Sequence, residues 1–177
     1  RESVHEGMLA LTAVSDMTRI TNAPGVAKAN SELHSVGLGA MNLHGYLAKN
    51  KIAYESEEAK DFARTFFMMM NYYSLEKSME IAKTRGITFQ DFERSEYAKG
   101  TYFDKYLEND YRPVTEKVRK LFAGIPIPSP SDWSRLKEQV SRYGLYHAYR
   151  LAIAPTQSIS YIQNATPSVM PVVDLIE

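Results

Sequence analysis

The chain has 177 residues, a length typical of one domain and sufficient to bury a hydrophobic core. Apolar residues make up 44% and charged residues 24%, which is a globular composition and not a disordered or fibrous one. Basic and acidic residues number 21 each, and the resulting net charge of zero argues against broad binding to nucleic acid or to a membrane surface. The chain contains no cysteine, which excludes disulfides, thiolate zinc sites and thiol nucleophiles within these residues.

The sequence predicts neither a signal peptide nor a membrane span. The polar start, Arg1 to His5, predicts no signal peptide, and the longest apolar run, Phe66 to Met70, is too short to span a bilayer. The chain lacks an initiator methionine and stops at Glu177 without the character of a tail. These features suggest an excerpt from a longer protein, with the cytoplasm as the expected compartment.

Helical periodicity predicts two helical regions in the first fifty residues. The first carries apolar residues at helical spacing and ends at Pro24-Gly25. Its periodic positions are Val4, Met8, Leu11, Val14 and Met17. The second runs from about Asn30 to Lys49, and its small residues at 37, 39, 40 and 45 allow a neighbouring backbone to approach closely.

A long helix is predicted to run from Glu57 to about Arg85. Ser56 is suited to the N-cap, acidic residues occupy the first turn, and Gly86 is a natural stop. One side of this helix is apolar and contains Phe62, Phe66, Met69, Tyr73 and Ile81.

The next segment is irregular. From Thr88 to Tyr111 aromatic and charged residues alternate without a period, which predicts short helical turns on a surface. A short helix is expected from Glu116 to Ala123, followed by an extended stretch from Ile125 to Pro130, because residues before proline avoid the helical region. The helix after this stretch is capped by Ser129 or Ser131 and ends at Gly144, with an apolar face of Trp133, Leu136, Val140 and Tyr143.

The few extended elements are expected in the last part of the chain. Leu151 to Ala154 is a short apolar run, interpreted as one buried strand, and Val169 to Ile176, interrupted by Pro171, is a loop or a short edge element. The sequence therefore predicts a mostly helical α/β chain with one or two strands. Because a strand needs partners, the rest of the sheet is expected outside this sequence.

The run from Pro155 to Ser160 is the best candidate for a binding site. A strand followed by a turn rich in hydroxyl and amide groups can direct several backbone N–H groups at a phosphate, and Thr156, Ser158 or Ser160 can add hydroxyl donors. The alternative is a helix N-cap or a serine/threonine turn that binds nothing. From the residues alone both interpretations stay open.

Other candidate motifs favour structural roles. The glycines at 37, 39 and 45 do not form a dinucleotide fingerprint, because Asn42 stands where the third glycine is needed. The four histidines lack the spacing of a metal site and are expected to be structural or at the surface; they are His5, His34, His44 and His147. Tyr72-Tyr73 is interpreted as core packing, and the glycosylation sequon at Asn164 as a chance match.

A longer pattern carries a family resemblance. Trp133 is followed by Leu136, by Gly144-Leu145-Tyr146-His147, by Leu151-Ala152 and by Pro155, and this spacing resembles the signature of the ribonucleotide reductase large (catalytic) subunit. Further stretches resemble its class Ib form, among them 11–16, 34–39, 41–47, 92–95 and 158–162. The resemblance covers essentially all 177 residues and corresponds to a middle-to-late part of a much longer subunit.

The resemblance implies a fold and an activity. The family's large subunit is a ten-stranded α/β barrel that reduces ribonucleoside diphosphates to deoxyribonucleoside diphosphates by thiyl-radical chemistry for DNA synthesis. The substrate diphosphate rests on a loop that matches Pro155, Thr156, Gln157, Ser158 and Ile159. Residues 1–177 would then be a single segment of the barrel domain, with a helical part at 1–150 and the strand and phosphate loop at 151–177.

The resemblance also implies what lies elsewhere. The radical cysteine, the redox cysteines, the relay tyrosines and the allosteric nucleotide site match segments absent here, so no catalytic residue, metal ligand or cofactor is expected in this chain, and Tyr72-Tyr73 does not inherit the relay role. The implied partners are a metal-containing small subunit that supplies the radical, a glutaredoxin- or thioredoxin-like thiol reductant and a second copy of the large subunit. The alternative is a non-catalytic helical module that binds a phosphorylated ligand or a protein.

Overall fold

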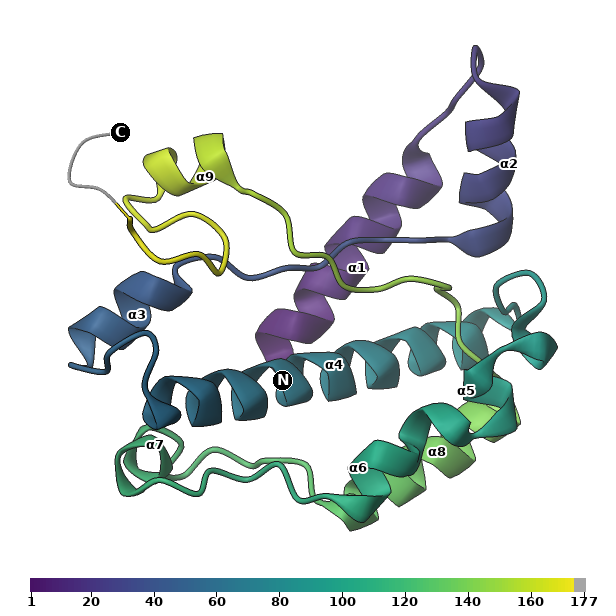
Figure 1. Ribbon diagram of the computed structural model, residues 1–177. Coiled ribbons are helices and arrows are strands. Elements are labelled where there is room, and N and C mark those ends of the chain that lie inside the picture. The colour runs from purple at the N-terminus through teal and green to yellow at the C-terminus, as the bar shows by residue number, and fades with distance from the viewer. Residues whose placement is uncertain (174–177) are drawn as a thin grey trace. The chain divides into compact units, whose positions relative to one another are not determined.

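The computed structural model describes residues 1–173 and is mostly helical in that range (Figure 1). No helix in the described range combines the length and the apolar character needed to cross a membrane. The chain divides into two compact units. The first unit comprises Arg1–Leu38, Phe67–Arg112 and Pro126–Leu151; the second comprises Gly39–Phe66, Pro113–Ile125 and Ala152–Glu177, of which the last four residues lie outside the described range.

The predictions for the two best-defined helices are confirmed. Helix α4 spans Glu57–Arg85, the side-chain oxygen of Ser56 accepts the N–H of Ala59 at 3.2 Å, and Gly86 ends the helix with φ +66°. Helix α8 spans Pro130–Tyr143 and begins with a capping box in which Ser129 and Asp132 bond to each other's backbone N–H groups. Strong local signals at both ends explain why these boundaries are visible in the sequence.

The predicted helical region from Asn30 to Lys49 is wrong. Helix α2 spans Pro24–Leu33 and helix α3 spans Leu43–Lys49, with extended chain between them. The backbone N–H groups of Val36 and Leu38 donate to the carbonyls of Tyr149 and Arg150 at 3.0 and 2.9 Å. Backbone hydrogen bonds to a distant segment thus replace the hydrogen bonds of a helix. Such long-range contacts cannot be predicted from the local periodicity of the sequence.

The expected strand is reduced to a single bridge. Leu38 and Leu151 form one isolated parallel bridge, and no strand is assigned between residues 1 and 173. The residues after Leu151 are exposed, with Ile153 at 77%, so the prediction of a buried strand from Leu151 to Ala154 is wrong for this chain. The described part of Val169–Ile176 contains a turn and irregular chain, and its residues from 174 onward lie outside the described range.

The first unit is built around an aromatic core. Helix α1 spans Glu2–Met17, and the irregular segment after α4 forms short helices whose aromatic side chains are buried or partly buried. These helices are η1 (Phe92–Arg94), α5 (Glu96–Lys99), η2 (Thr101–Phe103) and α6 (Asp104–Glu108). Tyr106 stacks on Trp133 of α8 with ring centroids 3.9 Å apart, and Phe103 has no exposed surface.

The predicted helical turns are therefore present, but their placement on a surface is wrong. Each turn is only three to five residues long; η1, η2 and α6 each bury one side chain and α5 buries none, so no helical period accumulates.

The second unit contains α3, the first part of α4, the short helix α7 (Glu116–Leu121) and α9 (Gln157–Ile162). Phe62 packs between Tyr46 and Phe122, with ring centroids at 4.9 and 5.5 Å. Asp61 of α4 accepts hydrogen bonds from the backbone N–H groups of Val114 and Thr115 and holds the chain entering α7.

Candidate functional site

The loop predicted to bind phosphate lies in the second unit and leads into α9. Thr156 adopts the left-handed conformation (φ 53°, ψ 20°), which is uncommon for a threonine, and its side-chain oxygen accepts the N–H of Ser168 at 2.7 Å. Pro155, Gln157, Ser158 and Ile159 are exposed, whereas Thr156 is half-buried. Pro155 and Thr156 thus precede α9, Gln157, Ser158 and Ile159 form its first turn, and the contact with Ser168 fixes the chain at Thr156.

The three hydroxyl groups of the loop play different parts. Ser160 is fully buried, donates its hydroxyl proton to the carbonyl of Gln157 at 2.7 Å and gives its N–H to the carbonyl of Thr156 at 2.8 Å. Its hydroxyl is therefore structural, and the prediction that Ser160 could contact a ligand is wrong. Thr156 can still donate its proton, and Ser158 is open to solvent.

A second set of hydrogen bonds anchors the chain that follows α9. Asn42 accepts the N–H of Thr166 on its side-chain oxygen at 3.0 Å, and its own N–H donates to the Thr166 carbonyl at 2.9 Å. The hydroxyl oxygen of Thr166 accepts the N–H of Gly45 at 3.2 Å. Thr166 of the predicted sequon therefore joins this segment to the start of α3.

The loop and the chain around it contain no charged side chain. Residues 151–173 include no acidic or basic side chain and no histidine. Any anion bound by this segment would be held by backbone N–H groups and hydroxyls, whose hydrogen bonds to a charged acceptor are stronger than those to a neutral one.

A buried arginine stands five residues before the loop, in the first unit. Arg150 is 5% exposed, and its guanidinium donates to the side-chain oxygens of Asn71 (3.1 Å) and Ser74 (2.6 Å) and to the hydroxyl of Tyr97 (3.1 Å). These partners are all neutral. The arrangement fixes the end of the segment that pairs with Leu38, and sequence reasoning did not identify it because its members are far apart in the chain.

His147 is the second buried polar centre of the first unit. Its Nε2 lies 2.9 Å from the Thr12 hydroxyl, which itself donates to the carbonyl of Met8, so Nε2 carries the proton and Thr12 accepts it. Its Nδ1 lies 2.9 Å from the hydroxyl of Ser78, which donates to it. Burial lowers the pKa of His147 to about 4, helped by the charge of Arg150. The ring is therefore neutral and structural at pH 7, as predicted.

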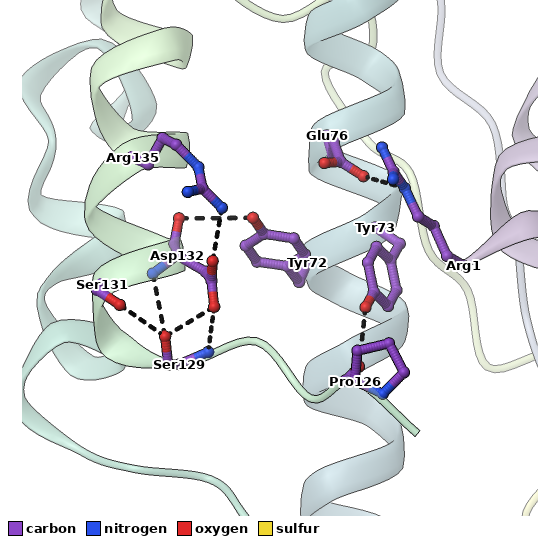
Figure 2. A network of polar contacts seen from close by, with 9 residues as sticks. All are labelled: Arg1, Tyr72, Tyr73, Glu76, Pro126, Ser129, Ser131, Asp132 and Arg135. Atoms are coloured by element: carbon purple, nitrogen blue, oxygen red, sulfur yellow. Dashed lines mark hydrogen bonds and ion pairs between the residues drawn. The ribbon is translucent and has the colours of Figure 1, made fainter. Parts of the chain in front are cut away.

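Tyr72 and Tyr73 border a cavity of about 210 Å³ in the first unit. Figure 2 shows the polar contacts of these tyrosines and of their neighbours. Their hydroxyls reach the backbone carbonyls of Asp132 (3.5 Å) and Pro126 (3.1 Å), and both side chains are more than 90% buried. Burial, together with the charges of Glu76 and Asp132, raises the pKa of Tyr72 to about 12. Both tyrosines pack in the core, which agrees with the sequence-based interpretation.

The residues of the Trp133–Pro155 pattern serve mainly to build the core. Trp133, Leu136, Leu145 and His147 are at most 1% exposed. Gly144 has φ 74°, and a Cβ atom there would lie 2.2 Å from Thr88 Cγ2. The pattern thus specifies a close-packed helix end, and only its last residue, Pro155, belongs to the exposed loop.

Comparison with known proteins shows the class to which this fold segment belongs. The family model described as "Ribonucleotide reductase, barrel domain" matches residues 1–177. The chain therefore belongs to the ribonucleotide reductase family, as the resemblance implied.

Relatives in three bacteria carry the same name. The chain is 58% identical to ribonucleoside-diphosphate reductase subunit alpha of Bacillus subtilis (strain 168) over 168 residues, which is 95% of this chain and 24% of the relative. It is 42% identical to the subunit alpha of Mycoplasma pneumoniae over 181 residues (99% of this chain, 25% of the relative), and 32% identical to that of Helicobacter pylori over 147 residues (83% and 18%). The chain spans about a quarter or less of the length of these curated relatives.

Proposed function

We propose that the natural polypeptide carrying these residues is the large subunit of a ribonucleoside-diphosphate reductase, class Ib-like, that reduces ribonucleoside diphosphates to deoxyribonucleoside diphosphates. The observation that carries this proposal is the match of the barrel-domain family model to the whole chain. The names of the relatives support it. A non-catalytic binding module has no comparable support.

The chain contributes one segment of the proposed ten-stranded barrel. The parallel bridge between Leu38 and Leu151 supports this, because parallel strands occur in sheets covered on both faces. Ile153 and Ile162, which are 77% and 80% exposed, are the type of side chain that further barrel elements would cover.

Within that subunit, Pro155, Thr156, Gln157, Ser158 and Ile159 bind the diphosphate of the substrate. The exposure of the loop and the free hydroxyl of Ser158 support this assignment. Fixed amide and hydroxyl donors bind an anion without a mobile lysine and position the remote ribose for reaction.

The remaining chemistry is assigned to other parts of the assembly. A metal-containing small subunit supplies the radical, a glutaredoxin- or thioredoxin-like protein reduces the cysteines outside this chain, and the large subunit forms a homodimer in the cytoplasm. The 177 residues alone are expected to show no turnover with the small subunit. Deoxynucleotide formation by this chain in isolation would contradict the proposal.

The test of the loop is steady-state kinetics on the natural polypeptide with its small subunit. Ser158→Ala removes one hydrogen bond to a charged group, worth roughly 1.5–3 kcal/mol, and is expected to raise the KM for the ribonucleoside diphosphate about ten- to a hundredfold. Gln163→Ala, an exposed change just beyond α9, is the matched control and should leave KM unchanged. An unchanged KM in the Ser158 variant would remove the loop from the substrate site.

A further inference from the structure

Three potential metal ligands from two helices meet in the first unit. His5 lies on α1, and Glu76 and Glu80 lie one turn apart on α4, so both carboxylates face the same side of that helix. One ligand atom from each of the three residues lies within 4.8 Å of the other two. Neither the family resemblance nor the proposed function gives these residues a role.

The contact between His5 and Glu76 is unusual. His5 Nε2 lies 3.0 Å from Glu76 Oε2, which is a hydrogen-bond distance, yet Nε2 is buried and has no hydrogen-bond partner in the described range. The ring nitrogen and the carboxylate oxygen are therefore close without forming a well-aligned hydrogen bond. Two electron-pair donors at this separation favour a cation that both can bind.

The surroundings of the group are partly buried and electrically balanced. The side chains of His5, Glu76 and Glu80 are 12%, 18% and 38% exposed. Arg1 Nε lies 3.0 Å from Glu76 Oε2, and Lys77 Nζ lies 2.9 Å from Glu80 Oε2. These two flexible cations satisfy the carboxylates when no metal is bound, and they would compete with one.

We propose that His5, Glu76 and Glu80 bind a zinc-class divalent ion that joins α1 to α4. One imidazole nitrogen and two carboxylate oxygens form a ligand set that suits Zn²⁺ and leaves a fourth position for water. Ligands at about 2.0–2.1 Å from a tetrahedral zinc lie roughly 3.3 Å apart, so a small side-chain rotation closes the site. Mg²⁺, which requires oxygen ligands in octahedral geometry, is the wrong ion for it.

The test counts zinc bound to the natural polypeptide. The protein is stripped with a chelator, exposed to Zn²⁺, desalted, and its zinc content per chain is measured by elemental analysis. His5→Gln and Glu80→Gln are each expected to bind one zinc fewer per chain than the parent. Glu93→Gln, an exposed glutamate outside the group, is the matched control and should bind as much as the parent. Counting differences between variants removes any zinc held by cysteines elsewhere in the polypeptide.

A variant that is expected to bind zinc more tightly separates an effect on metal binding from damage to the fold. Lys77→Gln removes a competing cation without removing a ligand, so it is expected to tighten zinc binding in a titration. Equal zinc content in the parent, His5→Gln and Glu80→Gln proteins would overturn the proposal, and so would weaker binding by Lys77→Gln. If His5→Gln does not fold, Glu80→Gln decides the question, because the Glu80 side chain is 38% exposed and its amide variant keeps the same shape.

Discussion

His147 Nδ1 lies 2.9 Å from the hydroxyl of Ser78, and the two side chains are fully buried. The Ser78 hydroxyl oxygen also accepts the backbone N–H of His147 at 3.1 Å, so one serine satisfies both the ring and the main chain. His147, the last residue of the Gly144-Leu145-Tyr146-His147 run, is thereby attached to the C-terminal half of α4. This connection requires a neutral imidazole, which makes the stability of the first unit sensitive to pH.

The first prediction concerns that sensitivity. His147 has a pKa of about 4 in the folded chain against about 6.5 in the unfolded chain, so the unfolded state binds more protons between these values. Its contribution to the free energy of unfolding is complete above pH 6.5 and is lost as pH falls toward 4, by about 3 kcal/mol in total. The measurement is denaturant unfolding of parent and His147→Gln proteins at several pH values.

The difference between parent and variant isolates His147, because His5 and His34, whose pKa values are also lowered by burial, are present in both. Thr12→Val is the companion control: it removes the acceptor of the Nε2 proton but keeps the ring. It is expected to cost about 1–3 kcal/mol at pH 7 and to retain the pH dependence. The same pH dependence in parent and His147→Gln would contradict the prediction.

The second prediction concerns Arg150. A lysine at this position cannot reach Asn71, Ser74 and Tyr97 together, because its single ammonium replaces a planar group with several donors. Arg150→Lys is expected to lower the free energy of unfolding by more than about 2 kcal/mol. Arg142→Lys, an exposed change, should stay within about 0.5 kcal/mol of the parent. Equal stability of the two variants would show that the hydrogen bonds of the Arg150 guanidinium contribute little to the free energy of unfolding.

The third prediction concerns Asp61 in the second unit. Burial acts to raise the pKa of this carboxyl, but hydrogen bonds from Thr115 and Val114 outweigh it, and the pKa lies below its usual value. The resulting stability is present above about pH 4, the unfolded pKa, and is lost as pH falls through the folded one.

Asp61→Asn replaces a double acceptor by a group with one acceptor oxygen. It is expected to destabilise the protein by at least about 1.5 kcal/mol at pH 7 and to lessen the loss of stability in acid. Thermal unfolding at pH 7 and pH 3.5 measures both effects. Glu57→Gln, which breaks an exposed ion pair with Lys60, serves as the control and should change stability by less than about 1 kcal/mol.

The fourth prediction compares two glycines. A Cβ atom at Gly39 would lie 2.6 Å from the carbonyl oxygen of Ala152, a backbone atom that cannot move aside by itself, so Gly39→Ala is expected to destabilise the second unit by about 1–3 kcal/mol. Gly25→Ala, in the first turn of α2, meets no atom within 4 Å and should be neutral or stabilising by up to about 1 kcal/mol. Melting temperatures of the two variants check this, and a Gly39 variant as stable as the parent would contradict it.

By itself the sequence determined the elements whose signals are local. The boundaries of α4 and α8 followed from Ser56, Ser129, Gly86 and Gly144, because caps and left-handed glycines act within one turn of the chain. The family was also visible in the sequence, because the residues from Trp133 to Pro155 resemble the family signature; in the structure most of them lie in a buried helix end.

Only the tertiary structure decided what depends on contacts across the chain. It divided the region from Asn30 to Lys49, because Val36 and Leu38 bond to residues more than a hundred positions away. It buried the aromatic residues of the short turns, directed Ser160 inward while Ser158 stayed exposed, and brought His5 to Glu76 and Glu80. Hydrogen bonds and packing of this kind depend on distance in space, which periodicity and composition along the chain do not encode.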